Sequence, residues 1–318
     1  MFSSRQTFTY LILTIALILA ACSTPSATPP AIPTHEAQPT EEVPLRSQAE
    51  QDAWNEDLDF FMTRLRETHP DPFYRVSEEE YLRSIDDLKT SLPSMTDEQI
   101  IVELARIVAF IDGHSTINTL GEPVNFHIYP LRTFLFSDGV FIVGAQEPFE
   151  NMTGGKIIQI GKLPIADVLD AVTPLIPHDN PMTIQLSAPS WIMRPQVLLA
   201  LGIIESSDNP QITIEMPDGT QQTINPAPVD WNDYREWARG DEFGNGPVFG
   251  LPERPEPLYL SRAGSESFWT TYLEDSGTLY IQYNRVQSGI GTLTREIQEI
   301  LDQQDVERVI LDLRLNPG

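Results

Sequence analysis

One histidine of this sequence stands where it could take part in chemistry. His114 lies in the tetrapeptide Asp-Gly-His-Ser, residues 112–115, at the end of an apolar helical pattern. An imidazole titrates close to neutral pH and can therefore act as a general base. Gly113 allows the sharp chain exit that would expose the ring. A lone histidine is more often a helix cap or a core residue, so the segment alone leaves both roles open.

A second polar group lies near the end of the sequence. The predicted strand at 309–313 consists mainly of Val, Ile and Leu but carries Asp312, and Arg314 follows two positions later. Residues two apart share one face of a strand, so these two side chains should point the same way and the alternate apolar residues the other way. We expect the strand to be buried with neighbours on both edges. A buried charge needs a partner, which an internal Asp312–Arg314 ion pair would supply without any chemistry.

Together the two segments resemble the motifs of the tail-specific (C-terminal processing) protease family, especially its tricorn-like branch. The first is the family's Asp-Gly-His-Thr element, with Ser115 in place of the commoner threonine. The resemblance implies that His114 is the general base that takes a proton from a nucleophilic serine. It implies that Asp112 is a structural hydrogen-bonding partner and that Ser115 keeps the supporting hydroxyl.

The second motif is D-x-R-x-N-x-G-G, of which this sequence carries all but the last glycine. The matching residues are Asp312, Arg314, Asn316 and Gly318. The resemblance implies that Asp312, Arg314 and Asn316 support a turn. The backbone amide of Gly318 would be one donor of an incomplete oxyanion hole, because glycine lets the chain approach a developing negative charge closely.

In that family the catalytic serine follows this motif. We therefore expect residues 1–318 to stop before the nucleophile and to be inactive alone. The resemblance covers about residues 55–318 and implies a multidomain α/β fold with a ClpP/crotonase-like core, of which 229–318 would be the N-terminal part. The alternatives are a non-catalytic peptide-binding lipoprotein and a pseudoenzyme.

The N-terminus carries the marks of export. Residues 1–21 are typical of a signal peptide, with Arg5 before an apolar stretch too short to span a membrane unaided. Leu-Ala-Ala-Cys at 19–22 resembles the bacterial lipobox, in which Cys22 is lipidated; an ordinary signal peptide is the alternative. Residues 22–47 are rich in Pro, Ser and Thr and predict a linker. The sequence thus predicts an exported bacterial lipoprotein, anchored to a membrane through Cys22 and facing the periplasm or the cell surface.

The rest of the chain divides into three predicted parts. Residues 48–122 predict a helical unit, with a helix over 48–68 and capping boxes at Ser77 and Thr96. Residues 123–228 resemble a PDZ-like module, with hairpins at 133–143 and 211–224 around a strand at 156–160 and a helix at 165–172. Within 229–318, residues 229–276 predict an irregular connection. A strand at 278–283, a helix near 297–301 and a strand at 309–313 predict a parallel βαβ unit.

Composition narrows the possible ligands. The formal net charge of −26 would repel phosphate backbones, so we expect no nucleic-acid partner. The family resemblance implies protein or peptide substrates. His127 and His178 lack acids at ligand spacing, and there is neither a phosphate loop nor a dinucleotide fingerprint, so no metal or cofactor is expected. Cys22 is the single cysteine, which leaves no intramolecular disulfide.

Overall fold

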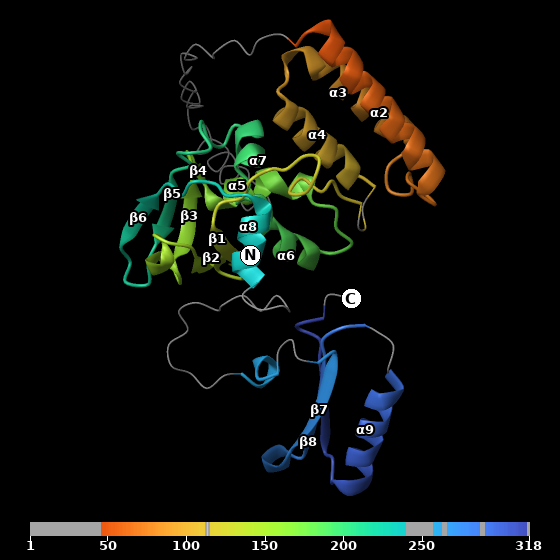
Figure 1. Cartoon of the computed structure of the whole chain (residues 1–318), viewed down its shortest axis with the longest axis vertical. Helices are drawn as coiled ribbons and strands as arrows, with labels where there is room; N and C mark the ends of the chain where they lie inside the picture. The colour runs from red at the N-terminus through yellow and green to blue at the C-terminus, as the bar shows by residue number, and fades with distance from the viewer. Residues whose placement is uncertain are drawn as a thin grey trace, which may run out of the picture. The chain divides into compact units, whose positions relative to one another are not determined.

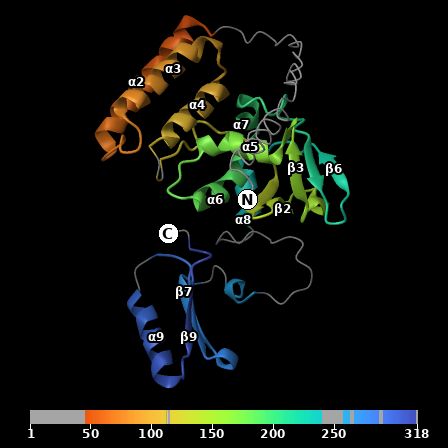
Figure 2. The same ribbon diagram turned by 180° about the vertical axis from the view of Figure 1, so that it is seen from behind.

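Three helices open the part of the chain that the computed structural model describes, which is residues 46–111, 113, 115–239, 257–262, 266–286 and 290–316. They are α2 (Gln48–Thr68), α3 (Glu78–Ser91) and α4 (Asp97–Ala109), and the 3-10 helix η1 (Leu92–Ser94) extends α3. Both views show α2 and α3 side by side (Figures 1 and 2). Within these described ranges, no helix is long and apolar enough to cross a membrane.

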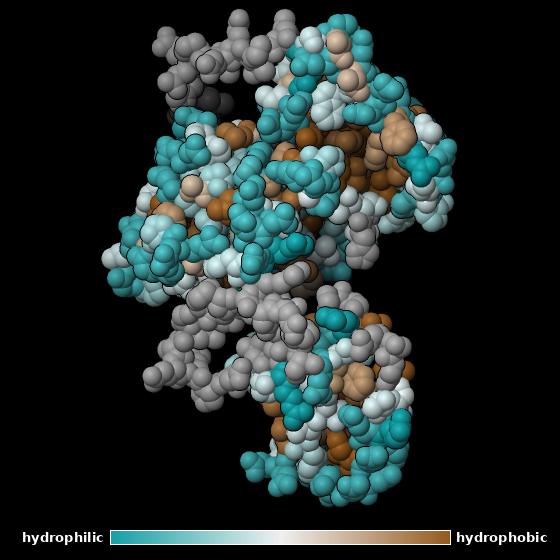
Figure 3. Space-filling model, in the orientation of Figure 1, coloured by the Kyte–Doolittle hydropathy of each residue, from teal (hydrophilic) through white to brown (hydrophobic). Residues whose placement is uncertain are grey.

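Each of these helices begins at a capping box. The side chains of Ser47, Ser77 and Thr96 accept hydrogen bonds from the backbone three residues on, and the Glu or Gln at that position bonds back to the cap. The boxes predicted at Ser77 and Thr96 are confirmed. The apolar faces pack into one core with Tyr81 and Leu92 fully buried. Apolar side chains also show on the surface over these helices (Figure 3).

An antiparallel sheet follows. Its neighbours run in the order β1-β2-β3-β5-β6, and the two-residue β4 pairs with β3. The predicted hairpins, the strand at 156–160 and the helix α5 (Ile165–Val172) are all confirmed. The strands are β1 (Leu131–Phe136), β2 (Gly139–Ala145), β3 (Lys156–Ile160), β4 (Leu163–Pro164), β5 (Ile212–Glu215) and β6 (Gln221–Ile224).

Several elements of this region have no counterpart in the sequence prediction. The helices α6 (Pro181–Trp191) and α7 (Pro195–Ala200) lie between α5 and β5, and α8 (Trp231–Arg239) follows the sheet. The 3-10 helices η2 (Glu150–Met152) and η3 (Thr173–Leu175) fill short connections. The core of the sheet also contains Val102 and Ala105 of α4, so α4 contributes to both hydrophobic clusters.

The C-terminal residues form a three-stranded sheet. β7 (Phe268–Leu273) is antiparallel to β8 (Thr278–Tyr283), and β8 is parallel to β9 (Arg308–Asp312). The crossover is α9 (Ile290–Gln303), so the predicted βαβ unit is confirmed. The 3-10 helices η4 (Leu258–Leu260) and η5 (Glu274–Ser276) precede and follow β7. The prediction that 229–276 is an irregular connection was wrong, since α8 and β7 lie within it.

β9 lies at one edge of this three-stranded sheet. Among the described strands it pairs only with β8, on one edge. Val309, Leu311 and Leu313 are at least 50% exposed, because α9 packs its Leu293 onto Leu279 and Ile281 of the central strand. Within the described part of the chain β9 is thus an exposed edge strand, and that a second neighbour buries it remains a prediction. Asp312 is the residue of β9 that is buried.

Candidate functional site

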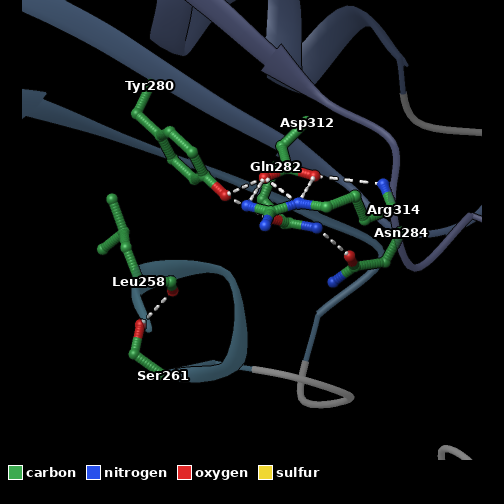
Figure 4. A network of polar contacts seen from close by, with 7 residues as sticks. All are labelled: Leu258, Ser261, Tyr280, Gln282, Asn284, Asp312 and Arg314. Atoms are coloured by element: carbon green, nitrogen blue, oxygen red, sulfur yellow. Dashed lines mark hydrogen bonds and ion pairs between the residues drawn. The ribbon is translucent and has the colours of Figure 1, made fainter. Parts of the chain in front are cut away.

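Asp312 and Arg314 form the ion pair that their spacing predicts. The Asp312 carboxylate ends β9 and is 6% exposed. It accepts hydrogen bonds from the backbone N–H of Arg314 at 3.0 Å and from the guanidinium Nε, which lies 3.0 Å from both carboxylate oxygens. The Nη2 of Arg314 also donates to Asp312, and Figure 4 shows the guanidinium lying along the carboxylate. Several charge-assisted bonds therefore fix one carboxylate in one orientation.

The neighbouring strand β8 completes the network. The Tyr280 hydroxyl lies 2.7 Å from Asp312 Oδ2 and also within hydrogen-bonding distance of the Gln282 side-chain oxygen. Gln282 is fully buried, and its amide nitrogen donates to Asn284 Oδ1 at 2.7 Å. The parallel register pairs Gln282 with Asp312, which explains why the two polar side chains meet. We define Tyr280, Gln282, Asp312 and Arg314 as the Asp312 network.

The charges in this network are held fixed at neutral pH. The hydrogen bonds from Arg314 lower the pKa of Asp312 to about 2 against the opposing effect of burial, and the same bonds raise the pKa of Arg314. Burial, followed by the bond to Asp312, raises the pKa of Tyr280 to about 12. None of the three side chains exchanges a proton near pH 7, so the network suits a supporting role better than acid–base catalysis.

The residues around the ion pair restrain the turn after β9. The Arg314 guanidinium lies 3.7 Å above the centre of the Tyr259 ring, a cation–π contact. The backbone N–H of Asn316 donates to the Leu313 carbonyl at 3.0 Å and closes the turn. The Asn316 side chain donates to the Tyr283 carbonyl at 2.9 Å, which ties the turn back to β8. That this turn supports an oxyanion site remains a prediction.

Three predicted site residues lie outside the described residues. They are Asp112, His114 and Gly318, and the lipidation candidate Cys22 lies outside them as well. Gly113 has a φ of +62°, the left-handed conformation that a sharp exit from α4 requires. Ser115 is half-buried in the segment that follows α4 and is not part of the Asp312 network. The role of His114 as a base therefore remains a prediction from sequence.

Sequence reasoning missed Tyr280 and Gln282. A signal for them existed, because polar and apolar residues alternate along β8, and Tyr280 and Gln282 lie on the same face. A parallel partner strand in register places Asp312 beside that face. Each strand alone gives only half of this information, and the register between them is what joins Tyr280 to Asp312.

Two other histidines, His127 and His69, make polar contacts within the protein. His127 Nε2 lies 3.3 Å from Asp230 Oδ1, and the other ring nitrogen lies 3.1 Å from the Gln196 amide. His69 ends α2, and its Nδ1 accepts a hydrogen bond from the Asp71 backbone at 3.3 Å. Within the described part of the chain, no three His, Cys, Asp or Glu residues are grouped to hold a metal ion.

Comparison with known proteins bears on the fold. No protein-family model matches the sequence, and no curated protein sequence matches it significantly. Mature CPAF complexed with lactacystin matches 84% of this chain and 57% of its own, at 15% identity and a TM-score of 0.53. Mature CPAF itself matches 84% of this chain and 56% of its own, at 16% identity and a TM-score of 0.51.

A third match is the photosystem II D1 C-terminal processing protease, at 12% identity over 86% of this chain and 62% of its own, with a TM-score of only 0.25. CPAF and this enzyme are both members of the tail-specific protease family. This chain spans less than two thirds of the length of each matched structure. Its mixed α/β fold, with a helical N-terminal region and antiparallel sheets, is thus similar to that of CPAF.

Proposed function

We propose that this chain belongs to a serine-type endopeptidase of the tail-specific type, which hydrolyses peptide bonds in proteins or peptides. The observation that carries the proposal is the likeness of its fold to that of mature CPAF over 84% of the chain, found without reference to any motif. The ordered pair of sequence motifs around His114 and Asp312 supports the same assignment. The tricorn-like branch is the closer match because of the Asp-Gly-His element.

In this proposal His114 takes the proton of a serine hydroxyl as that oxygen attacks the substrate carbonyl. The same imidazole then returns the proton to the leaving amine. The Gly318 amide faces the oxyanion that forms, and the turn containing Asn316 holds that amide in place. The resemblance assigns no nucleophilic serine within residues 1–318. Tests of catalysis therefore use the protein that the gene encodes.

The domain roles follow from the same resemblance. Residues 123–228 would be a PDZ-like module that presents substrate tails, and the antiparallel sheet with α5 supports this reading. Residues 229–318 would be the first part of a ClpP/crotonase-like core, which the parallel βαβ unit of β8, α9 and β9 supports. Cys22 would anchor the protein to a membrane through its lipid, with 22–47 as the tether and the folded part facing the periplasm or the cell surface.

Cleavage of a dye-labelled, unfolded protein tests the function. The translated gene product should cleave it, and His114→Ala should lower kcat/KM by at least a hundredfold, as loss of a general base does. His69→Ala is the matched control, because His69 caps α2 and, among the described residues, hydrogen-bonds only to Leu65 and Asp71. Cleavage that His114→Ala leaves intact would remove His114 from the mechanism and, with it, the motif-based part of the assignment.

A non-catalytic peptide-binding lipoprotein is the second candidate. Edge strand β1 exposes the rings of Phe134 and Phe136, which contact each other with centroids 4.7 Å apart. The adjacent α6 exposes Met182 and Leu186. An apolar strand edge next to a helix is a surface that an extended peptide can join as an additional strand. Tight peptide binding with no turnover by the translated gene product would favour this candidate or a pseudoenzyme.

A further inference from the structure

A pocket of about 450 Å³ opens between α6 and the segment that follows α4. Among the described residues of its wall, Arg194 is the one with a charged side chain, and the others carry hydroxyl, amide, aromatic and aliphatic groups. None of the described residues that line it is acidic, although the chain as a whole has a formal charge of −26. The lining residues are Thr116, Ile117, Asn118, Thr119, Leu186, Ser187, Ser190, Trp191 and Arg194.

Arg194 is held rigidly in this wall. It is 9% exposed, and its guanidinium lies 4.1 Å from the centre of the Trp191 ring. Its Nη1 donates to the Thr119 hydroxyl at 2.8 Å and its Nη2 to the Ser190 hydroxyl at 3.2 Å. Its Nε is buried without an acceptor among the described residues. Neutral hydroxyl groups therefore orient the Arg194 guanidinium, and its Nε–H remains available as a donor.

The charge of Arg194 lacks a counterion in the part of the chain that is described. The arginines that form ion pairs there are all residues other than Arg194. Burial alone lowers the pKa of Arg194 to about 9. A buried charge without a partner costs free energy, whereas an apolar side chain of similar volume would cost less. The positive charge of Arg194 at the wall of a pocket would therefore favour the binding of an anionic ligand there.

We infer that this pocket binds a carboxylate through Arg194, a ligand site separate from the Asp312 network. A planar carboxylate matches the guanidinium fork, and the hydroxyls of Thr116 and Ser187 offer further donors around it. Leu186, on the same wall, is 73% exposed and would contact an apolar group attached to the carboxylate. The shared chemistry is a carboxylate bearing an apolar group, which a peptide C-terminus or a small organic acid can supply.

Binding measurements on residues 22–318 test this inference without any need for catalysis. The probes are an acetylated tetrapeptide ending in leucine with a free carboxylate, its C-terminal amide, and isovalerate as the small acid. The free-acid peptide should bind at least tenfold more tightly than the amide by calorimetry. If isovalerate matches the peptide, the ligand is a small acid; if it binds at least tenfold more weakly, the ligand is a peptide terminus. Equal binding of free acid and amide would overturn the proposal.

Substitutions of Arg194 test whether carboxylate binding depends on this residue rather than on another part of the surface. Arg194→Met should lose the preference for the free acid and should retain or gain thermal stability, because an unpaired buried charge is removed. Arg194→Lys should bind at least tenfold more weakly than wild type, because an ammonium cannot form the two-pronged contact. Arg83→Met, on the exposed side of α3, is the matched control and should bind like wild type. An undiminished preference in Arg194→Met would also overturn the proposal.

Discussion

The Tyr280 hydroxyl lies 2.7 Å from the Asp312 carboxylate, which joins the centre of one strand to the end of the next. Asp312 thus has a buried neutral donor on one side and Arg314 on the other. Because a hydrogen bond to a charged group stabilises more than a neutral one, this contact should contribute measurably to the stability of the β7–β9 sheet.

Tyr280→Phe should therefore destabilise the sheet by about 2 kcal/mol, because it removes one donor from a buried carboxylate. Amide hydrogen exchange of β8 and β9 measures this change locally. Tyr272→Phe is the control, since its hydroxyl donates to the Asp305 carbonyl at 2.8 Å at an exposed position. Exchange rates that rise equally in the two variants would show that the contact with Asp312 contributes no more to the stability of the sheet than the exposed Tyr272 contact does.

Asp312 should make the sheet sensitive to acid. Its pKa is depressed from an ordinary value of 3.8 to about 2 in the folded state. The stability it contributes is fully present above about pH 4 and is lost as the pH falls toward 2. The full effect is about 2 kcal/mol by linkage.

Asp312→Asn should consequently lower stability at pH 7 and flatten the loss between pH 4 and pH 2. Urea unfolding at several pH values, followed by amide exchange in β9, measures the difference from wild type. Asp302→Asn on the exposed face of α9 is the control and should leave the acid profile unchanged. A profile for Asp312→Asn that is parallel to that of wild type would contradict the assigned linkage.

Tyr81 differs from Tyr280, whose buried hydroxyl has a hydrogen-bond partner. Its side chain is fully buried in the helical core, and its hydroxyl has no hydrogen-bond partner among the described residues. Burial raises the pKa of Tyr81 accordingly. Tyr81→Phe should leave stability unchanged or raise it by about 1 kcal/mol, because an unpaired buried hydroxyl is removed and the ring contact with Phe73 is retained. A Tm that falls by several degrees would point to a water or partner at that hydroxyl.

The sequence predicts these elements unevenly, and the reasons are physical. Helices α3 and α4 begin where a local pattern of four residues forms a closed pair of hydrogen bonds, so Ser77 and Thr96 mark them without tertiary information. Helix α6 is different, because it is apolar without a clear period and contains Pro189. Asn180 and Pro181 mark the start of this helix locally, and its packing against β1 supports the rest of it.

Strand β7 was missed for another reason. Its run Phe-Trp-Thr-Thr-Tyr-Leu has strong strand preference, but it follows a stretch rich in proline and glycine that suggests an irregular connection. The candidate site shows the same limit. Asp312 and Arg314 were found because their spacing is local, whereas Tyr280 and Gln282 join them only through the parallel register. The sequence of one strand is therefore enough to predict the motif residues, but their buried partners on the neighbouring strand can be predicted only when the register is known.

The proposed membrane anchor depends on Cys22. In cells that process lipoproteins, the protein should incorporate a radiolabelled fatty acid and partition into the detergent phase of a Triton X-114 extract. Cys22→Ser should abolish both, since it removes the single thiol of the chain. Ser23→Ala is the matched control, because it changes the adjacent residue and leaves the thiol. Labelling that survives Cys22→Ser would show that the anchor is elsewhere, and secretion of an unlabelled wild-type protein would favour an ordinary signal peptide.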